Sequence, residues 1–176
     1  MSKFNMEMNF CRRCGTALLH QGGPVYKCAQ NHTIFLVAAA AVGLAVVNQK
    51  NEVLLLERAI DPGKGKLDIP GGFCDGPESL DEAVAREVEE EVGLTPSDYS
   101  KPVYLLSAVD PYDYEGETLP VSSIVYTARL TTDKQPVAAD DAASVEWVPL
   151  AELDLDKVYF PAIREGLEYL IKTQSA

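Results

Sequence analysis

The sequence predicts an α+β fold in which a mixed β-sheet is sandwiched between helices, an α/β/α arrangement, with a small cysteine-containing unit before it. Three observations predict this fold. Apolar runs typical of strands alternate irregularly with two helical patterns, three of the four cysteines fall before residue 30, and 176 residues suffice for one main domain and a small appendage. We therefore expect one unit over residues 1–34 and a second over residues 35–176.

The amino-terminal unit carries a pattern of metal ligands. Cys11 and Cys14 form a C-x2-C knuckle, and Cys28 and His32 follow a glycine-containing turn. Three cysteines and one histidine make a common tetrahedral Zn²⁺ site. A segment of about 35 residues cannot close a hydrophobic core, so structural zinc would stabilise a zinc ribbon here. His20 is an alternative fourth ligand, and a unit without zinc or with oxidised cysteines is the other interpretation.

The second unit begins with the apolar run FLVAAAAVGLAVV, which spans only 13 residues. This is short of the roughly 18 to 20 residues that cross a bilayer, so we expect a buried strand and no membrane association. The polar segment 110–120 is expected to be a loop, and a closing amphipathic helix is expected over 161–172. The expected strands cover residues 37–47, 52–58, 67–69, 102–109, 122–130 and 144–148.

Another helix is expected over residues 80–92. Ser79 followed by Glu82 is a capping-box pattern, and Gly93 then ends the run. The apolar residues of this segment define an inward face. Because each helical residue turns the face by about 100°, Arg86 is expected on the opposite, outward side.

Three carboxylates of this helix do not follow the outward pattern. Glu87, Glu90 and Glu91 are spaced i, i+3 and i+4, so they share one face, and that face overlaps the apolar side. Like charges packed together and partly out of water repel one another and raise their own pKa values. A Mg²⁺ or Mn²⁺ ion, which prefers carboxylate oxygens, would neutralise them. The alternative is a solvated acidic helix whose charges serve only solubility.

Segment 72–94 resembles the Nudix box, G-x5-E-x7-R-E-U-x-E-E-x-G-U, where U is a bulky aliphatic residue. The chain matches every fixed position, and this many matches at strict spacing make the resemblance specific. The matching residues are Gly72, Glu78, Arg86, Glu87, Val88, Glu90, Glu91, Gly93 and Leu94. The resemblance identifies residues 35–176 as a Nudix hydrolase domain and implies the mixed-sheet sandwich of that family.

The resemblance also implies an activity. Nudix hydrolases cleave the diphosphate linkage of a nucleoside diphosphate derivative with water and metal, so the expected partner is a small molecule such as ADP-ribose, NADH, FAD or a similar dinucleotide. Members similar to NADH pyrophosphatases carry an amino-terminal zinc ribbon, but the SQPWPxPxS-type signature of the NADH enzymes is absent. The alternative function is a non-catalytic nucleotide-sensing module whose ribbon contacts a partner.

Individual roles follow from the same resemblance. The three glutamates of the shared face would bind the Mg²⁺ or Mn²⁺. Glu78 and Arg86 would form a hydrogen-bonded pair that orients Glu87. Gly72 would let the backbone approach the metal or a phosphate closely, because it has no Cβ.

The proton acceptor is expected either in the box or in a loop beyond it. Asp140 and Asp141 stand just before the strand expected over 144–148 and are the candidates outside the box. A box glutamate is the alternative base. A plain solvated loop explains the aspartate pair equally well.

Substrate-binding residues are expected in the loops that surround the sheet. Tyr112 and Tyr114 could stack on an adenine or flavin ring, or could simply anchor their own loop. Lys64 and Lys66 lie shortly before the box and could meet phosphate, or could be solvated surface residues.

Composition excludes several classes of partner. A net charge of −12 excludes nonspecific nucleic-acid binding, because the phosphate backbone would be repelled. Clustered cysteines in a metal pattern, without a signal-peptide pattern, predict a reducing cytoplasm. Nudix members similar to this one often dimerise, which leaves a homodimer open.

Overall fold

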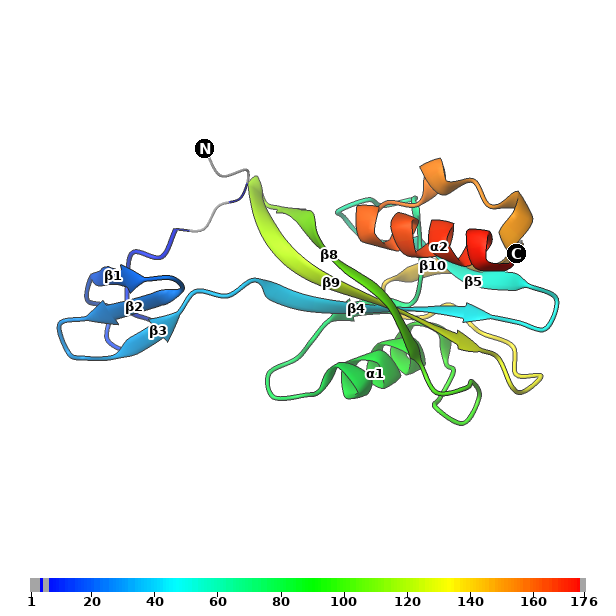
Figure 1. The fold of residues 1–176 in the computed structure, drawn as a ribbon, viewed down its shortest axis with the longest axis horizontal. Helices are drawn as coiled ribbons and strands as arrows, with labels where there is room; N and C mark the ends of the chain where they lie inside the picture. The colour runs from blue at the N-terminus through cyan, green and yellow to red at the C-terminus, as the bar shows by residue number, and fades with distance from the viewer. Residues whose placement is uncertain (1–3, 5–6, 175–176) are drawn as a thin grey trace.

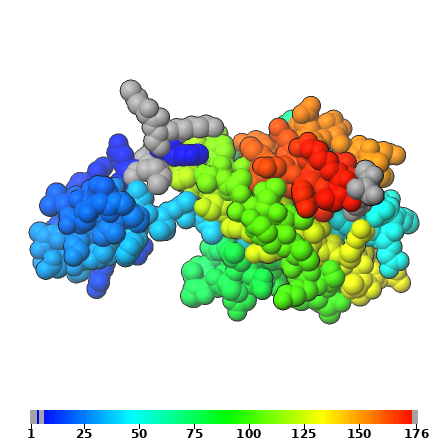
Figure 2. Space-filling model, viewed as in Figure 1, coloured from blue at the N-terminus to red at the C-terminus, as the bar shows by residue number. Residues whose placement is uncertain are grey.

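Two β-sheets of unequal size organise the protein (Figure 1). In the computed structural model, which describes residue 4 and residues 7–174, a three-stranded sheet lies at one end and a seven-stranded sheet forms the main body. The space-filling view shows the small unit as a separate lobe (Figure 2). The outermost residues of the predicted 1–34 and 35–176 units lie outside the described residues.

The small unit is an antiparallel sheet in the order β1-β2-β3. Its strands are β1 (Leu18–Gly22), β2 (Val25–Cys28) and β3 (Thr33–Phe35). The buried core of this unit consists of only Cys11, Cys28 and Ile34 among the described residues. Because so small a core contributes little stability, this short unit is expected to need a further stabilising element such as a bound metal ion.

The main sheet has the order β10-β5-β4-β9-β8, with β6 paired to β5 and β7 paired to β4. β4 and β9 are parallel, whereas the other pairs are antiparallel, so the predicted mixed sheet is confirmed. The strands are β4 (Ala39–Val47), β5 (Glu52–Arg58), β6 (Leu67–Asp68), β7 (Gly71–Phe73), β8 (Val103–Tyr114), β9 (Glu117–Arg129) and β10 (Ala142–Pro149). Two short 3-10 turns, Leu150–Glu152 and Leu155–Lys157, follow β10.

Helices cover both faces of the main sheet (Figure 1). α1 (Leu80–Val92) packs on one face and α2 (Pro161–Gln174) on the other. Alternate residues of β4 serve the two layers, since Val46 packs in the layer beneath α1 and Val47 in the layer beneath α2. A strand covered on both sides has no polar face, which explains the continuous apolar run and confirms the α/β/α sandwich.

Neither helix within the described residues combines the length and apolar character that crossing a membrane requires. The predicted bounds of β5 and α1 agree with the structure to the residue. β7 is a strand that the sequence did not predict, because its GGF sequence has no apolar alternation.

The segment 110–120, expected to be a loop, is instead a strand hairpin. β8 continues to Tyr114 and β9 starts at Glu117, with a two-residue turn at Glu115 and Gly116. Both turn residues have positive φ, 48° and 87°, which is the pattern that suits the twist of a hairpin. The loop prediction was wrong because β8 is an edge strand, whose polar side chains can meet water without ending the strand.

Candidate active site

Capping at both ends of α1 positions the box carboxylates. The side chain of Ser79 accepts a hydrogen bond from the Glu82 N–H, and the Glu82 carboxylate accepts one from the Ser79 N–H, which confirms the capping box. Gly93 ends the helix in the left-handed conformation, with φ 70°. The apolar side of α1 packs on the sheet, and this contact decides which way the remaining side chains point.

The three box glutamates run from the core to the surface. Glu91 is buried, and its Oε2 accepts a hydrogen bond from the Gly71 N–H at 2.8 Å. The side chain of Glu87 is only 13% exposed, whereas that of Glu90 is 48% exposed. The shared face of these acids therefore overlaps the apolar side most at Glu91 and least at Glu90.

Arg86 does not point into solvent as the helical pattern alone predicted. Its Nη2 donates to Glu78 Oε1 at 2.7 Å and its Nε donates to Glu78 Oε2 at 3.2 Å. Its Nη1 donates to Glu87 at 2.8 Å and to Glu90 at 3.1 Å. A bidentate guanidinium of this kind holds its partners in a defined geometry. Arg86 therefore joins the loop before α1 to two of the box carboxylates.

Two adjacent glycines bring the backbone of β7 against these carboxylates. A Cβ at Gly72 would lie 2.5 Å from Glu87 Oε1, so only glycine leaves room for that carboxylate where it stands. A Cβ at Gly71 would collide with the Val42 carbonyl oxygen across the β4–β7 pair. Glycine at position 72 therefore leaves room for the Glu87 carboxylate, whereas glycine at position 71 allows β7 to pair closely with β4.

The electrostatics of the glutamates favour a cation. Burial raises the pKa of Glu91 to about 8, although the Gly71 N–H opposes the rise, and nearby negative charges that include Glu87 and Asp141 add to it. Burial also raises the pKa of Glu87, against the effect of Arg86. Each box glutamate uses one oxygen for Arg86 or Gly71, while its second oxygen accepts no hydrogen bond from the described residues. Partly buried carboxylates with open oxygens fit Mg²⁺ or Mn²⁺.

A cavity of about 340 Å³ opens beside these carboxylates. Asp140 and Asp141 line it together with the box acids, so the structure brings the candidate proton acceptors to the box. Two backbone hydrogen bonds hold their loop in place: the Ala139 N–H donates to the Glu91 carbonyl at 2.9 Å, and the Ala59 N–H donates to the Asp141 carbonyl at 2.8 Å.

Of the four residues predicted to bind substrate, Tyr112 lines the cavity and the other three do not. Lys64 and Lys66 are exposed in the loop between β5 and β6, and Tyr114 lies at the exposed end of the β8–β9 hairpin. Their roles in substrate binding stay predictions.

The cavity also includes residues that the sequence did not single out. Among them are five residues from five separate segments, so no spacing along the chain reveals these five, and only their side-chain chemistry gave any signal in advance. The five are Arg58, Asp68, Phe73, Asp110 and Phe160.

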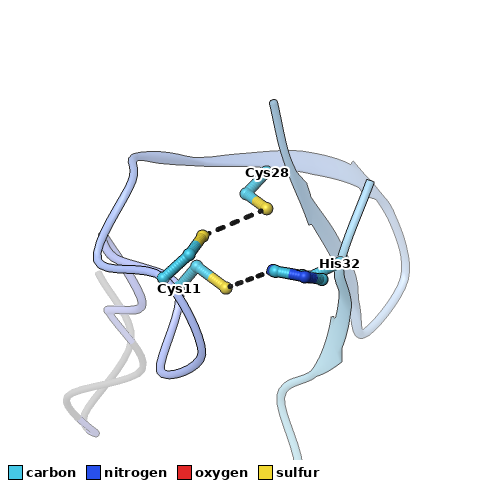
Figure 3. A group of neighbouring side chains, drawn as sticks. Cys11, Cys28 and His32 are labelled. Carbon is cyan, nitrogen blue, oxygen red and sulfur yellow. Dashed lines mark hydrogen bonds between the residues drawn. The ribbon is translucent and has the colours of Figure 1, made fainter. Parts of the chain in front are cut away.

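The amino-terminal unit gathers a second set of ligand atoms. One atom from each of Cys11, Cys14, Cys28 and His32 lies within 4.8 Å of the others. Figure 3 shows Cys11 directed at His32, with Sγ and Nδ1 3.6 Å apart, while Cys14 and Cys28 have their sulfur atoms 3.7 Å apart. His20 is not a member of this cluster, and its Nε2 lies 2.8 Å from the Gly23 carbonyl oxygen. The geometry therefore selects His32 over His20 as the fourth member of the set.

Comparison with known families agrees with this geometry. The NUDIX domain matches residues 37–169, which is more than half of the chain. The chain therefore belongs to the Nudix hydrolase family, a class of pyrophosphohydrolases.

The chain is similar to an ADP-ribose pyrophosphatase from Methanocaldococcus jannaschii, with 34% identity over 125 residues that cover 70% of this chain and 69% of that protein. The mitochondrial NAD(P)H pyrophosphatase NUDT13 from Homo sapiens is 36% identical over 86 residues, 48% of this chain but 24% of that protein. Among solved structures, a NUDIX hydrolase from Nitrosomonas europaea matches with a TM-score of 0.70 over 96% of this chain and 93% of that chain. At 24% identity this last likeness shows the fold alone.

Proposed function

We propose that the protein is a Mg²⁺- or Mn²⁺-dependent pyrophosphohydrolase that cleaves the diphosphate linkage of a nucleoside diphosphate derivative. The proposal depends on one observation. Three box carboxylates, each with an oxygen that accepts no hydrogen bond from the described residues, line the same cavity as Asp140 and Asp141. A volume of about 340 Å³ is within the range of small-molecule sites. The similarity to an ADP-ribose pyrophosphatase supports a substrate of the same type.

Different residues of this chain would take different parts in the reaction. A divalent ion held by the box glutamates would supply charge neutralisation at the diphosphate and a more acidic water. Arg86 holds Glu87 in position through its bonds to both Glu78 and Glu87. Asp140 and Asp141 are the candidate proton acceptors outside the box, because both line the cavity beside the box glutamates.

A nucleotide panel with and without Mg²⁺ tests this function. Glu91→Gln and Glu90→Gln are each expected to lower kcat about 10² to 10³-fold, because they weaken charge stabilisation that is worth several kcal/mol. Glu89→Gln is the matched control, since Glu89 belongs to the same helix but is exposed and does not line the cavity. Activity at the wild-type level in both Glu90 and Glu91 variants would refute the proposal. A nucleotide-sensing module would instead show a higher melting temperature with ligand and release no product.

We also propose that Cys11, Cys14, Cys28 and His32 hold a structural Zn²⁺. Support comes from the gathering of one atom of each within 4.8 Å and from the very small apolar core of this unit. Tetrahedral sites of three sulfur ligands and one nitrogen ligand are typical of structural zinc. The metal would then stabilise the fold of the lobe and take no part in the reaction.

A further inference from the structure

Asp110 is a buried carboxylate that the proposed reaction does not use. It lies on β8 and is only 2% exposed, yet it lines the cavity. Its Oδ1 accepts a hydrogen bond from the Ala162 N–H, in the first turn of α2, at 3.0 Å. Its Oδ2 is buried and has no hydrogen-bond partner among the described residues. A buried acceptor that makes no hydrogen bond costs free energy, so we expect a hydrogen-bond donor to bind at this oxygen.

The cations near Asp110 do not satisfy that oxygen. Arg58 also lines the cavity, but its Nη1 donates to Asp68 at 2.9 Å and its Nε donates to the Pro62 carbonyl at 2.7 Å. Asp68 is itself a buried cavity residue, so this part of the lining holds two carboxylates and one arginine. Because two carboxylates face one arginine, a phosphate would be repelled here, and the donors that a nucleoside diphosphate derivative can offer instead are its neutral amines and hydroxyls.

Aromatic rings line the cavity around the same place. The rings of Tyr112 and Phe160 are nearly parallel, with centroids 6.2 Å apart, and Tyr112 meets Phe73 edge-on at 5.1 Å. All three line the cavity. Aromatic walls with a small number of polar groups are a common way to fix the orientation of a ligand.

We propose that Asp110 is a specificity-determining residue, whose free oxygen accepts a hydrogen bond from a neutral donor group of the substrate, either an exocyclic ring amine or a sugar hydroxyl. The inference rests on the proposed function, since Asp110 and the box glutamates line the same cavity. Arg58 is bonded to Asp68 and to the Pro62 carbonyl and the neighbouring rings are aromatic, so a bond to the free oxygen of Asp110 distinguishes substrates that carry the donor from those that lack it.

The test is Asp110→Asn. Its side-chain oxygen can still accept from the Ala162 N–H, while the atom that replaces Oδ2 becomes a donor. Kinetics are measured on ADP-ribose, on its hypoxanthine counterpart, which replaces the amine by a carbonyl, and on analogues that lack single sugar hydroxyls. Wild-type protein is expected to lose about 10- to 100-fold in kcat/KM on the analogue without the recognised donor, because the buried oxygen is then left without a hydrogen bond. Most of this loss should appear in KM, because the bond is made in the ground state as well.

Two patterns support the proposal. If the ring amine is recognised, Asp110→Asn reduces or reverses the preference for adenine over hypoxanthine. If a sugar hydroxyl is recognised, the variant loses activity on ADP-ribose but no longer discriminates against the corresponding deoxy analogue. A uniform fall of kcat/KM on every analogue, or a wild-type protein that discriminates against none of them, overturns the proposal and leaves Asp110 as a cap of α2.

The control is Asp113→Asn, the same change on the same strand at a residue that bonds to Thr118 near the hairpin end. It does not line the cavity and should leave every ratio unchanged. Binding of the same analogues, measured by calorimetry in the presence of Mg²⁺, gives a readout that needs no turnover. Absence of cleavage in the wild type would count against the proposed function, whereas equal affinities for all analogues would count against Asp110.

Discussion

Gly72→Ala separates the geometry of the site from the stability of the fold. A Cβ at Gly72 would lie 2.5 Å from Glu87 Oε1, and ordinary contact begins at 3.4 Å, so the carboxylate must retreat by about 0.9 Å. The backbone at Gly72 is outside the left-handed region, and the obstacle is the end of a flexible side chain. The substitution should therefore leave the fold intact and displace Glu87.

The expected activity loss follows from that displacement. A misplacement of about 1 Å in a reacting group costs on the order of 10²-fold, so kcat/KM of Gly72→Ala should fall by about that factor. Its melting temperature should stay close to that of the wild type. Steady-state kinetics and thermal unfolding on one preparation measure both quantities.

Two further variants control the experiment. Gly71→Ala places a Cβ against the Val42 carbonyl, which is backbone and cannot move aside, so it should destabilise the fold by more than about 2 kcal/mol. Gly166→Ala crowds the Val125 side chain at 2.8 Å but does not line the cavity, so it should retain full kcat/KM. Wild-type kcat/KM in Gly72→Ala would refute the reasoning, because the position of Glu87 would then be irrelevant to the reaction.

Three other predictions follow from the structure. The Thr95 N–H and Lys134 hold the pKa of Asp98 well below its usual range. A lowered pKa stabilises the fold fully above the usual value of about 3.9, and this stabilisation is lost gradually as the pH falls from there towards the lowered pKa, so Asp98→Asn should lower the melting temperature most at pH 7 and by progressively less below about pH 4. Metal analysis should find about one zinc ion per chain, which Cys28→Ser removes and His20→Ala retains; a value near zero in the wild type would contradict the zinc site. Because a general base contributes at least about 10²-fold, Asn at whichever of Asp140 and Asp141 is the proton acceptor should lower kcat by about that factor, and wild-type kcat in both Asp140→Asn and Asp141→Asn would assign the base to the box.

The parts of the fold that the sequence predicted well depend on local patterns. α1 begins and ends where its capping residues indicate, because a cap bonds only to neighbours in the chain. The hairpin of β8 and β9 was missed, because its polar residues are tolerated only through its place at the edge of the sheet. Arg86 was misplaced by helix periodicity, since its long side chain turns back to Glu78.

The residues of the candidate site also fall into two groups, those that a local spacing reveals and those that only the tertiary structure brings together. The spacing of the box glutamates and of the cysteines was sufficient to pick out two sets of candidate ligands. Asp110, which was assigned to a loop, turned out to be a buried cavity residue with an oxygen that has no hydrogen-bond partner in the described part of the chain. Lys64 and Lys66 were chosen for their closeness to the box in the sequence, yet neither of them lines the cavity.

The sequence by itself determined which residues are the candidates for metal binding, because one turn of a helix or one knuckle brings possible ligands together at short spacing whatever surrounds them. Only the tertiary structure decided what faces those residues across the cavity. Asp141 arrives from the loop before β10, Tyr112 from β8 and Phe160 from the segment before α2. Their meeting depends on strand order and register, which many distant apolar contacts establish together and no local pattern encodes.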